Sequence, residues 1–348
     1  WLAPLGIEVA WLTGSLKKRE KTAVLAKVGA GETAIVVGTH ALIEEAAVFK
    51  RFGLAIVDEQ HRFGVRQRLA LKEKGQFAHQ LAMSATPIPR TLAMSYYADL
   101  DVSVLDELPP GRTQVTTRLA AESRRDEVID RVHAACREGR QAYWVCPLIE
   151  EIEALQLRTA QETHAALSAA LDDLRVGLLH GRLKAEEKAA VMAEFAANRI
   201  QVLVATTVIE VGVDVPNASL MVIEHAERFG LAQLHQLRGR VGRGAAKSTC
   251  ILLYAQPLGE IARARLKVIY ESSDGFEIAR EDLRLRGPGE FVGARQSGQP
   301  LLRYADLQDV ALVEQAQALA DRLLRDAPAT AETHLQRWLG GREELLKA

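Results

Sequence analysis

The stretch LAIVDEQHRFG, at residues 54–64, decides the fold. Its first four residues are apolar and predict a short strand that is buried on both faces. This strand runs directly into Asp58 and Glu59, and ligands of open α/β folds bind at the edge where parallel strands end. The stretch therefore predicts an α/β protein with a polar site at that edge. A loop of charged residues after a strand is the alternative.

Two acids at this place suit the chemistry of nucleotides. Asp58 would hold Mg²⁺ through a water, because a hard cation prefers oxygen ligands. Glu59 would polarise the water that attacks a γ-phosphate, and Gln60 and His61 would sense that phosphate from behind.

Composition limits the class of protein. At 348 residues the chain is long enough for two or three domains. It carries 44 Lys and Arg against 45 Asp and Glu, so nucleic-acid binding must come from local patches. Cys136, Cys146 and Cys250 lack the spacing of a disulfide framework or a zinc site, which fits a reducing compartment.

The ends and the apolar runs carry two further expectations. No apolar run has membrane length and no signal segment opens the chain, so we expect a soluble, intracellular protein. The chain starts at Trp1, inside an apolar pattern and without a methionine, and we interpret it as part of a longer protein.

The residues before the central stretch predict a basic helix at 16–28 and a buried strand at 34–37. This strand ends in Gly38, Thr39 and His40, whose hydrogen-bonding groups could contact a nucleic-acid phosphate. A helix capped by the Thr-His pair is the alternative.

Another buried strand is expected at 80–83, and it runs into Ser84 and Thr86. Two hydroxyls at a strand end could bridge the acids to a neighbouring element. An ordinary Ser/Thr turn before Pro87 is the alternative.

Two prolines and a glycine at residues 106–112, DELPPGR, favour an extended connector, and we place a domain boundary there. Beyond it strands alternate with helices, which predicts a parallel sheet with helices on both faces. The chain therefore carries two α/β units in tandem. The expected strands are 115–119, 142–145, 176–179, 202–204, 220–223 and 249–253, and the expected helices are 124–136, 159–171 and 184–196.

The second unit has polar residues at its own strand ends. His180 follows one strand, Thr206 and Thr207 follow another, and Asp214 stands before a proline turn. The two threonines could donate to nucleic-acid phosphates, and Asp214 could accept from a ribose hydroxyl.

Residues 236–244, QLRGRVGRG, give the stronger signal, because glycines between arginines let guanidinium groups three residues apart reach one target. The fork of an arginine matches phosphate geometry, and an arginine finger is worth about 10³–10⁵ in rate in well-studied NTPases. A solvated basic helix end is the alternative.

Taken in order, these motifs resemble the RecA-like motor of superfamily 2 helicases. Six motifs in that family's order and spacing are far more specific than any one of them. The matching segments are Gly38-Thr39-His40, the Walker B box at 58–61, Ser84-Ala85-Thr86, His180-Gly181, residues 205–216 and residues 236–243.

Further residues resemble the RecG family, bacterial DNA translocases that remodel stalled forks and branched junctions. They are HRFGV at 61–65, ATPIPRTL at 85–92, and DLRLRGPGEF at 282–291 with QSG at 296–298, a tail like that family's translocation motif. The transcription-repair coupling factor shares this tail, but its box is usually Asp-Glu-Glu-His, whereas this chain has Gln60.

Carried over residue by residue, the resemblance implies ATP and Mg²⁺ as cofactors and branched double-stranded DNA as the partner. Asp58 would hold Mg²⁺, Glu59 would be the catalytic base, and Arg240 and Arg243 would be fingers on the γ-phosphate. The other implied roles are ATP binding by Gly212, Asp214 and Gln236, coupling by Gln60, His61, Ser84 and Thr86, DNA contact by Thr39, His40, Thr206 and Thr207, and translocation by Arg284, Arg286 and Gln296.

The resemblance also implies a domain order. We expect a partial first RecA-like lobe at 1–105, a linker at 106–113, a second lobe at 114–257 and a helical translocation region at 258–348. From Arg238 to Arg303, twelve Lys or Arg stand against seven Asp or Glu, a local excess that suits phosphate contacts. A solvated helical tail is the alternative, and the amphipathic helices expected from residue 307 on, with Trp338, receive no function.

The sequence contains no GxxxxGKS or GxxxxGKT phosphate loop, which in this family lies upstream of the point where the chain begins. We therefore expect little ATPase activity from this chain alone. We expect the intact protein to be an ATP-driven DNA helicase, monomeric, cytoplasmic and associated with the nucleoid, with a single-stranded-DNA-binding protein as a partner. A binding module without chemistry and a transcription-repair translocase are the alternatives, and a pure binding module would need neither a base nor fingers.

Overall fold

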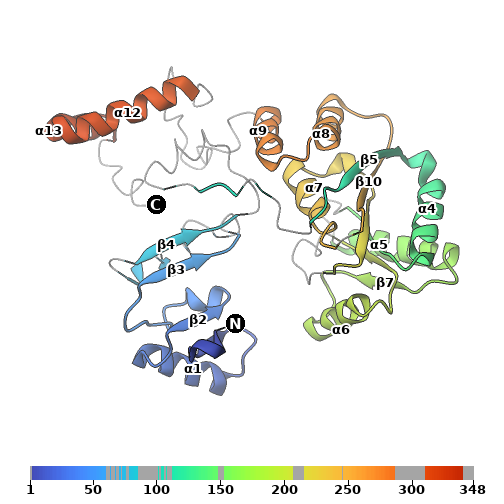
Figure 1. The fold of residues 1–348 in the computed structure, drawn as a ribbon, viewed down its shortest axis with the longest axis horizontal. Helices are drawn as coiled ribbons and strands as arrows, with labels where there is room; N and C mark the ends of the chain where they lie inside the picture. Colours follow the sequence, from blue (N-terminus) through green and yellow to red (C-terminus); the bar gives the residue numbers. More distant parts are fainter. Residues whose placement is uncertain are drawn as a thin grey trace. The chain divides into compact units, whose positions relative to one another are not determined.

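The computed structural model describes residues 2–59, 63, 67, 70–71, 73–75, 78–84, 101, 103–105, 107, 112–147, 153–206, 215–244, 246–286 and 310–339. The chain forms two compact units, Trp1–Ala85 with Ala316–Ala348 and Thr86–Gln315 (Figure 1). The domain limits expected at residues 105, 113 and 257 stay predictions.

The larger unit is built on six parallel strands in the order β5-β10-β9-β6-β8-β7. Parallel pairing requires a crossover between neighbouring strands, and the alternation of strands and helices along the chain predicts it. All six strands expected from the sequence are present. They are β5 (Thr116–Ala121), β6 (Gln141–Val145), β7 (Val176–Leu179), β8 (Val202–Ala205), β9 (Ala218–Ile223) and β10 (Thr249–Tyr254).

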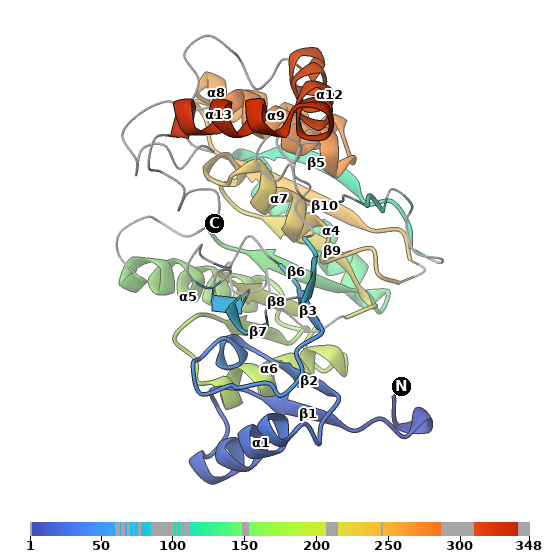
Figure 2. The ribbon, with the colours of Figure 1, turned by 90° about the vertical axis from the view of Figure 1, so that its left-hand side faces the viewer.

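Helices cover both faces of this sheet. One face packs on α4 (Arg125–Arg137) and α5 (Glu153–Ala170), and the other on α6 (Ala185–Ala196) and α7 (Leu231–Arg238). The face with α7 also carries α8 (Glu260–Glu271) and α9 (Gly275–Arg286), which lie side by side (Figure 1, Figure 2). The short 3-10 turns η4 (Glu122–Arg124) and η6 (Ala226–Arg228) precede α4 and α7.

Side chains of the central strands alternate between the two faces. Ala142 and Trp144 of β6 belong to the core under α4 and α5, whereas Tyr143 and Val145 belong to the core under α6 to α9. None of the four is more than 3% exposed. Since successive residues of a strand point to opposite faces, a continuous apolar run is what a strand covered on both sides needs.

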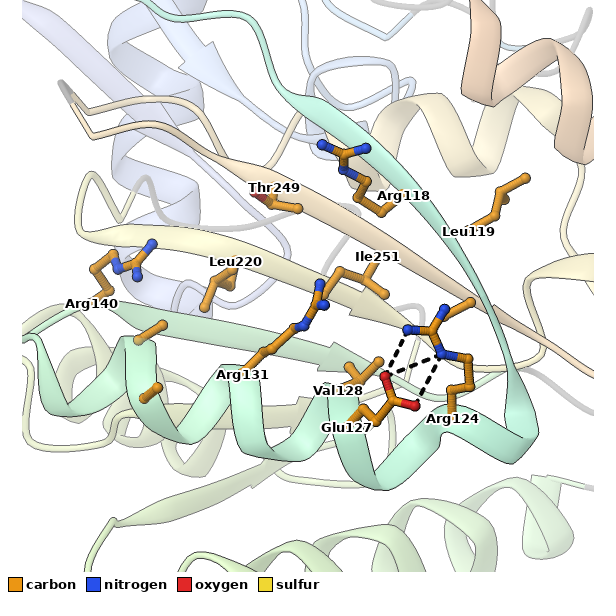
Figure 3. A pocket seen from close by; sticks show the side chains of 13 residues that line it. Arg118, Leu119, Arg124, Glu127, Val128, Arg131, Arg140, Leu220, Thr249 and Ile251 are labelled. Carbon is orange, nitrogen blue, oxygen red and sulfur yellow. Dashed lines mark hydrogen bonds and ion pairs between the residues drawn. The ribbon is translucent and has the colours of Figure 1, made fainter.

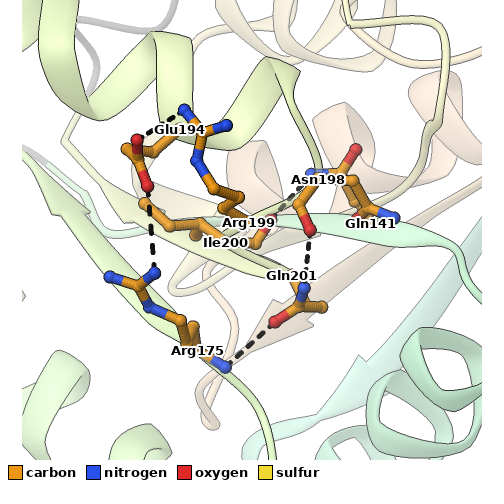
Figure 4. Close-up of polar contacts among 7 residues, drawn as sticks. All are labelled: Gln141, Arg175, Glu194, Asn198, Arg199, Ile200 and Gln201. Carbon is orange, nitrogen blue, oxygen red and sulfur yellow. Dashed lines mark hydrogen bonds and ion pairs between the residues drawn. The ribbon is translucent and has the colours of Figure 1, made fainter.

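A polar network closes the amino end of this sheet, opposite the candidate site. The side-chain amide of Gln141 donates to the carbonyls of Phe195 at 2.6 Å and Ile200 at 2.7 Å. Nearby, Glu194 pairs with Arg199 at 2.6 Å and with Arg175 at 3.8 Å (Figure 4). These contacts fix the end of α6 to the strands, which is a structural role.

The three cysteines all lie buried in the larger unit, as free thiols. Cys136 ends the buried face of α4, Cys146 follows β6, and Cys250 is on β10. Burial is the main cause that raises the pKa of Cys136 to about 11 and those of Cys146 and Cys250 to about 12.

The smaller unit holds two separate pairs of parallel strands in its described residues. They are β1 (Val9–Leu12) with β2 (Ile35–Gly38), and β3 (Leu54–Val57) with β4 (His79–Ala82). The turns η1 (Ala3–Leu5) and η2 (His40–Leu42) and helix α1 (Lys18–Ala30) accompany them. Helix α1 ends at Gly31, whose φ of 74° is the left-handed cap that glycine favours, close to the predicted stop.

The burial predicted for these strands is wrong. Leu54 and Ile56 of β3 are 53% and 59% exposed, Leu81 of β4 is 50% exposed, and Val37 of β2 is 44% exposed. Each strand has a single partner in the described part of the chain, and the buried cluster there is small, with Leu12, Ala41 and Ala47 at its centre. An apolar run predicts burial only where layers cover both faces, and here they do not.

Two helices follow near the end of the chain, α12 (Val310–Asp326) and α13 (Pro328–Leu339). They confirm the helices expected after residue 307, and the side chain of Trp338 lies outside the described residues. Among the helices that the structure describes, none is both long and apolar enough to cross a bilayer.

Candidate nucleotide and nucleic-acid sites

Strands β3 and β4 bring the first group of predicted residues to one edge. Val57 is paired with Ala82, and the N–H of Met83 donates to the carbonyl of Val57 at 2.8 Å. Asp58 and Glu59 therefore leave the sheet beside Ser84, and a bridge from this hydroxyl to the acids stays a prediction. Asp58 is exposed and Glu59 is half-buried.

The backbone at Glu59 is left-handed. Its φ is 52°, and its N–H donates to Oδ1 of Asp58 at 2.9 Å. A residue with a β-carbon seldom adopts this conformation, and such residues concentrate at functional sites. This turn follows immediately after strand β3 and is held by the hydrogen bond to Asp58.

The residues around Asp58 suit only one kind of metal binding. In the described part of the chain, no three His, Cys, Asp or Glu side chains cluster as metal ligands. Mg²⁺ often takes one or two carboxylates and completes its shell with waters and substrate phosphates. A single carboxylate at a strand end therefore fits Mg²⁺ that arrives with a nucleotide, and does not fit an all-protein cage.

The segment with Thr39 and His40 lies at the end of β2. A β-carbon on Gly38 would collide with the carbonyl oxygen of Leu12, so the close approach of β1 requires glycine there. Thr39 stands at the N-cap position of η2, where the capping alternative expects it, but its side chain makes no capping hydrogen bond. The ring of His40 stacks on Phe63 with centroids 5.1 Å apart and planes 18° apart.

Phe63 belongs to the segment HRFGV at 61–65, and no role was predicted for it. Its stacking on His40 joins the segment after β2 to the box that follows β3. The available signal was an aromatic residue immediately behind a box of charged residues.

The carboxyl edge of the larger sheet holds the second group. Leu179 of β7 is paired with Ala205 of β8, and the N–H of Thr206 donates to the carbonyl of Leu179 at 3.2 Å, which places His180 next to Thr206. Burial, and then the charges of Lys188 and Arg182, lower the pKa of His180. Thr206 is 5% exposed, which leaves little of its surface for DNA.

Glu224 is a buried residue at this edge that the sequence analysis missed. Its carboxylate accepts from Arg125 Nε at 2.7 Å, from Thr163 Oγ1 at 3.3 Å and from Cys146 Sγ at 3.8 Å. The guanidinium of Arg125 also lies 5.3 Å from the ring centre of Trp144. The signal was available, because Glu224 follows an apolar run that forms a strand, as Asp58 does.

Arg238 at the end of α7 is also buried, at 5% exposure. Its Nη1 donates to the carbonyls of Ile269 at 2.9 Å and Ser272 at 2.8 Å, and lies 3.3 Å from Oγ1 of Thr117. Its Nη2 donates to Nδ1 of His235 at 3.0 Å. The solvated helix end considered as the alternative is therefore wrong for this arginine, which ties α7 to the end of α8.

Arg240 and Arg243 follow directly after this tie. Arg240 is half-buried and Arg243 is exposed, and Nε of Arg243 donates to the carbonyl of Gly239 at 3.5 Å. Between them Gly242 has a φ of 82°, and a β-carbon there would lie 2.8 Å from Cγ2 of Val115. Glycine is thus required at this turn, which sets the spacing of the two arginines.

The remaining predicted residues are less informative. Gln236 is half-buried on α7, and Arg284 pairs with Glu281 at 2.9 Å on the exposed side of α9. Arg286 ends α9, and its side chain is outside the described residues. Gln60, His61, Thr86, Thr207, Gly212, Asp214, Gln296 and most of the linker also lie outside them.

Three family models match the chain. They are the DEAD/DEAH box helicase over residues 1–95, the helicase conserved C-terminal domain over residues 124–245, and domain 3, C-terminal, of the ATP-dependent DNA helicase RecG over residues 272–338. The last is specific to one of the two translocases that share the tail motif, which disfavours the transcription-repair alternative.

Curated relatives agree with these models. The ATP-dependent DNA helicase RecG of Escherichia coli K12 is 56% identical over 345 residues, covering 97% of this chain and 50% of the relative. The protein of the same name from Acidithiobacillus ferridurans is 57% identical over 343 residues, covering 98% of this chain and 50% of the relative. The chain therefore spans about half the length of the curated relatives that it matches.

Solved structures show the same likeness. A structure of RecG bound to a three-way DNA junction is 46% identical, with a TM-score of 0.67, and the match covers 90% of this chain and 41% of that one. Dbp5 of S. cerevisiae bound to RNA and ADP BeF3 has a TM-score of 0.53 at 16% identity, over 80% of this chain and 73% of that one, which supports the fold alone.

Proposed function

The chain belongs to the RecG family, and on that premise we propose that it forms most of the motor of an ATP-dependent DNA helicase. In the intact protein this motor moves along double-stranded DNA and remodels branched substrates such as stalled replication forks and Holliday junctions. The chain contributes both RecA-like units and the α8–α9 hairpin.

The residues divide the chemistry between them. Asp58 would hold Mg²⁺, and the bound ion would supply charge neutralisation for the phosphates. Glu59 takes a proton from the attacking water, and Arg240 and Arg243 stabilise the charge that develops on the transferring phosphoryl group. Gln236, Gly212 and Asp214 bind the nucleotide.

Given that the chain belongs to this family, one structural observation supports the proposal. The parallel register of β3 and β4 sets Asp58 and Glu59 beside Ser84, so the two carboxylates and the hydroxyl to which the proposal gives roles share one sheet edge. A binding module would need a basic surface but no general base. In this proposal Thr39, His40 and Thr207 contact the DNA backbone, and Thr206 does so only through the small part of its surface that is exposed. Coupling of hydrolysis to motion is assigned to Ser84, Thr86, Gln60 and His61, and translocation to Arg284, Arg286 and Gln296.

The proposal also covers the oligomeric state, the location, the partners and the domain order of the protein. We propose a monomeric, cytoplasmic protein associated with the nucleoid, with a single-stranded-DNA-binding protein as a partner. The domain order proposed is a first lobe at 1–105, a linker at 106–113, a second lobe at 114–257 and a translocation region at 258–348.

The first test compares ATPase activity of this chain with that of a version extended upstream through a phosphate loop. Each is assayed with and without a synthetic three-way junction. Turnover only in the extended, junction-stimulated sample would support the motor. Turnover in neither would favour a binding module, and helicase-like turnover by this chain alone would contradict the need for the loop.

A second test addresses Glu59 in the intact protein. Glu59→Gln should leave ATP binding in place and lower turnover by about 10²–10⁴-fold, because an amide cannot take a proton from water. Binding is measured with a fluorescent ATP analogue and turnover by phosphate release.

Glu32→Gln is the matched control, since Glu32 is an exposed glutamate of the same unit and follows the end of α1. It should behave as the parent protein. Unchanged turnover in Glu59→Gln would remove Glu59 from the role of base.

A further inference from the structure

A groove runs along α4 on the outer part of the larger sheet. It has a volume of about 700 Å³ and lies between α4 and the strands β5, β10 and β9 (Figure 3). Helices α4 and α5 cover β6 and β8 on this face, whereas the face of β5 and β10 opens into the groove. The groove lies on the flank of the sheet and runs from Arg124, just before α4, to Arg140, just before β6.

The floor of the groove is apolar. Ile251 of β10, Leu220 of β9 and Val128 of α4 line it, and each is between 5% and 7% exposed. Because these side chains lie under the opening, a bound group that reaches the floor must itself be apolar to lose little hydration.

The walls are basic. Arg118 projects from β5, Arg131 and Arg124 from α4 and the turn before it, and Arg140 stands at the far end (Figure 3). Among the described residues that line the groove with them, Glu127 is the one acid. Four arginines against one carboxylate give this groove a positive charge in a chain whose total charge is −1.

Two of these arginines lack an ion pair in the described part of the chain. Arg140 pairs with Glu138 at 2.7 Å, and Arg124 pairs with Glu127 at 2.7 Å. Arg118 and Arg131 have no carboxylate within 4.0 Å in that part of the chain. The charge of Arg131 nevertheless contributes to lowering the pKa of Glu127. A carboxylate of a bound partner would therefore form its most favourable ion pairs at Arg118 and Arg131.

The contact between Arg124 and Glu127 shows how an arginine of this groove binds a carboxylate. Nε of Arg124 lies 3.1 Å from Oε1 of Glu127, and its Nη2 lies 2.7 Å from Oε2, which is the paired geometry that arginine offers to planar anions. The hydrogen bond from Arg124 is the main cause that lowers the pKa of Glu127.

We propose that this groove is a docking site for an acidic peptide segment of a protein partner, with carboxylates on Arg118 and Arg131 and one apolar side chain on the floor at Ile251 and Leu220. Positive walls around an apolar floor match such a peptide in charge and in polarity. Duplex DNA matches it less well, because its phosphates lie on a broad convex cylinder that has no apolar group to insert between a helix and a strand.

The test uses the whole chain and a short fluorescein-labelled peptide in which aspartates flank one leucine, followed by fluorescence anisotropy. Arg131→Ala and Arg118→Ala should each weaken binding by about tenfold, since a charge-assisted hydrogen bond is lost. Replacing the aspartates by asparagines, or the leucine by serine, should also weaken it.

Arg137→Ala is the matched control. Arg137 is on the same helix and its side chain is 69% exposed, but it lies outside the groove, 3.8 Å from Asp173. It should bind the peptide as the parent chain does, and circular dichroism melts establish that all variants are folded.

Three results would overturn the proposal. They are an absence of peptide binding by the parent chain, an equal loss in Arg137→Ala and Arg131→Ala, and binding of a DNA duplex that depends on Arg118 and Arg131 while the peptide does not compete. The last result would assign the groove to nucleic acid.

Discussion

At the scale of single residues, the hydrogen bond between His235 and Arg238 determines which nitrogen of the histidine carries a lone pair. An arginine can only donate, so Nδ1 of His235 must carry the lone pair that receives Nη2 of Arg238 at 3.0 Å. Burial is the main cause that lowers the pKa of His235 to about 4, and the charge of Arg238 adds to it. The histidine is therefore neutral and is a fixed part of the tie between α7 and α8.

This tie predicts acid sensitivity. An unfolded histidine has a pKa of about 6.5, so as the pH falls from 6.5 toward 4 the unfolded chain takes up a proton that the native chain refuses. Stability that is present above pH 6.5 should decrease over this window by up to about 3 kcal/mol. His235→Gln should flatten that decrease in thermal melts recorded between pH 7 and pH 4.

Gln233→Ala is the control, since Gln233 is on the same helix and caps Gly230 through a hydrogen bond of 3.2 Å. It should lower the melting temperature without altering its slope against pH. An acid decrease that is identical in the parent chain and in His235→Gln would contradict the assignment.

At the scale of elements, the α8–α9 hairpin depends on one buried guanidinium. The carbonyls of Ile269 and Ser272 come at the end of α8, and both accept from Arg238. A carbonyl left without a donor in a buried place costs free energy, so the arginine holds the hairpin at the turn that carries Arg240 and Arg243.

Arg238→Leu should therefore destabilise the larger unit by about 3 kcal/mol, because it strands the acceptors of a buried cation. The measurement is urea unfolding, with hydrogen exchange of the amides around residues 269–274 as a local readout. Arg263→Leu, at an exposed position of α8, is the control and should change little. Equal effects of the two changes would contradict a stabilising role for the hydrogen bonds of Arg238.

The elements also mark what the sequence could predict. The strands of the larger unit were predictable in position and in burial, because continuous apolar runs such as 142–145 have helices on both sides. The run at 54–57 is equally apolar, but half of its side chains are exposed to solvent. Burial depends on the neighbouring layers and not on the run itself. Asp58 and Ser84 were predictable as neighbours from parallel pairing, whereas the link of Arg238 to Ile269 joins residues far apart in sequence and leaves no pattern.

At the scale of the whole molecule, the two units differ in how completely they are built. The larger unit has six paired strands and a core on both faces, and α8 and α9 contribute Leu266, Ile269 and Ile278 to one of those cores. The smaller unit has two-stranded sheets and exposed apolar residues in its described part.

We therefore expect the units to differ when they are expressed separately. A fragment of residues 112–286 should melt cooperatively, because its sheet and both cores are complete within it. A fragment of residues 2–84 should give no cooperative transition, since an isolated pair of strands is marginally stable at best. Calorimetry of the two fragments decides, and a sharp transition in 2–84, or none in 112–286, would contradict this view.

The placement of the cysteines gives the molecule a built-in reporter. The reactive form of cysteine is the thiolate, and thiols buried with pKa values of about 11 to 12 hold almost none of it at neutral pH. A thiol reagent can therefore label this chain only at moments when the six-stranded unit opens, while the smaller unit, which has no cysteine, stays silent. The labelling rate of the unmodified chain thus measures the opening free energy of one unit alone.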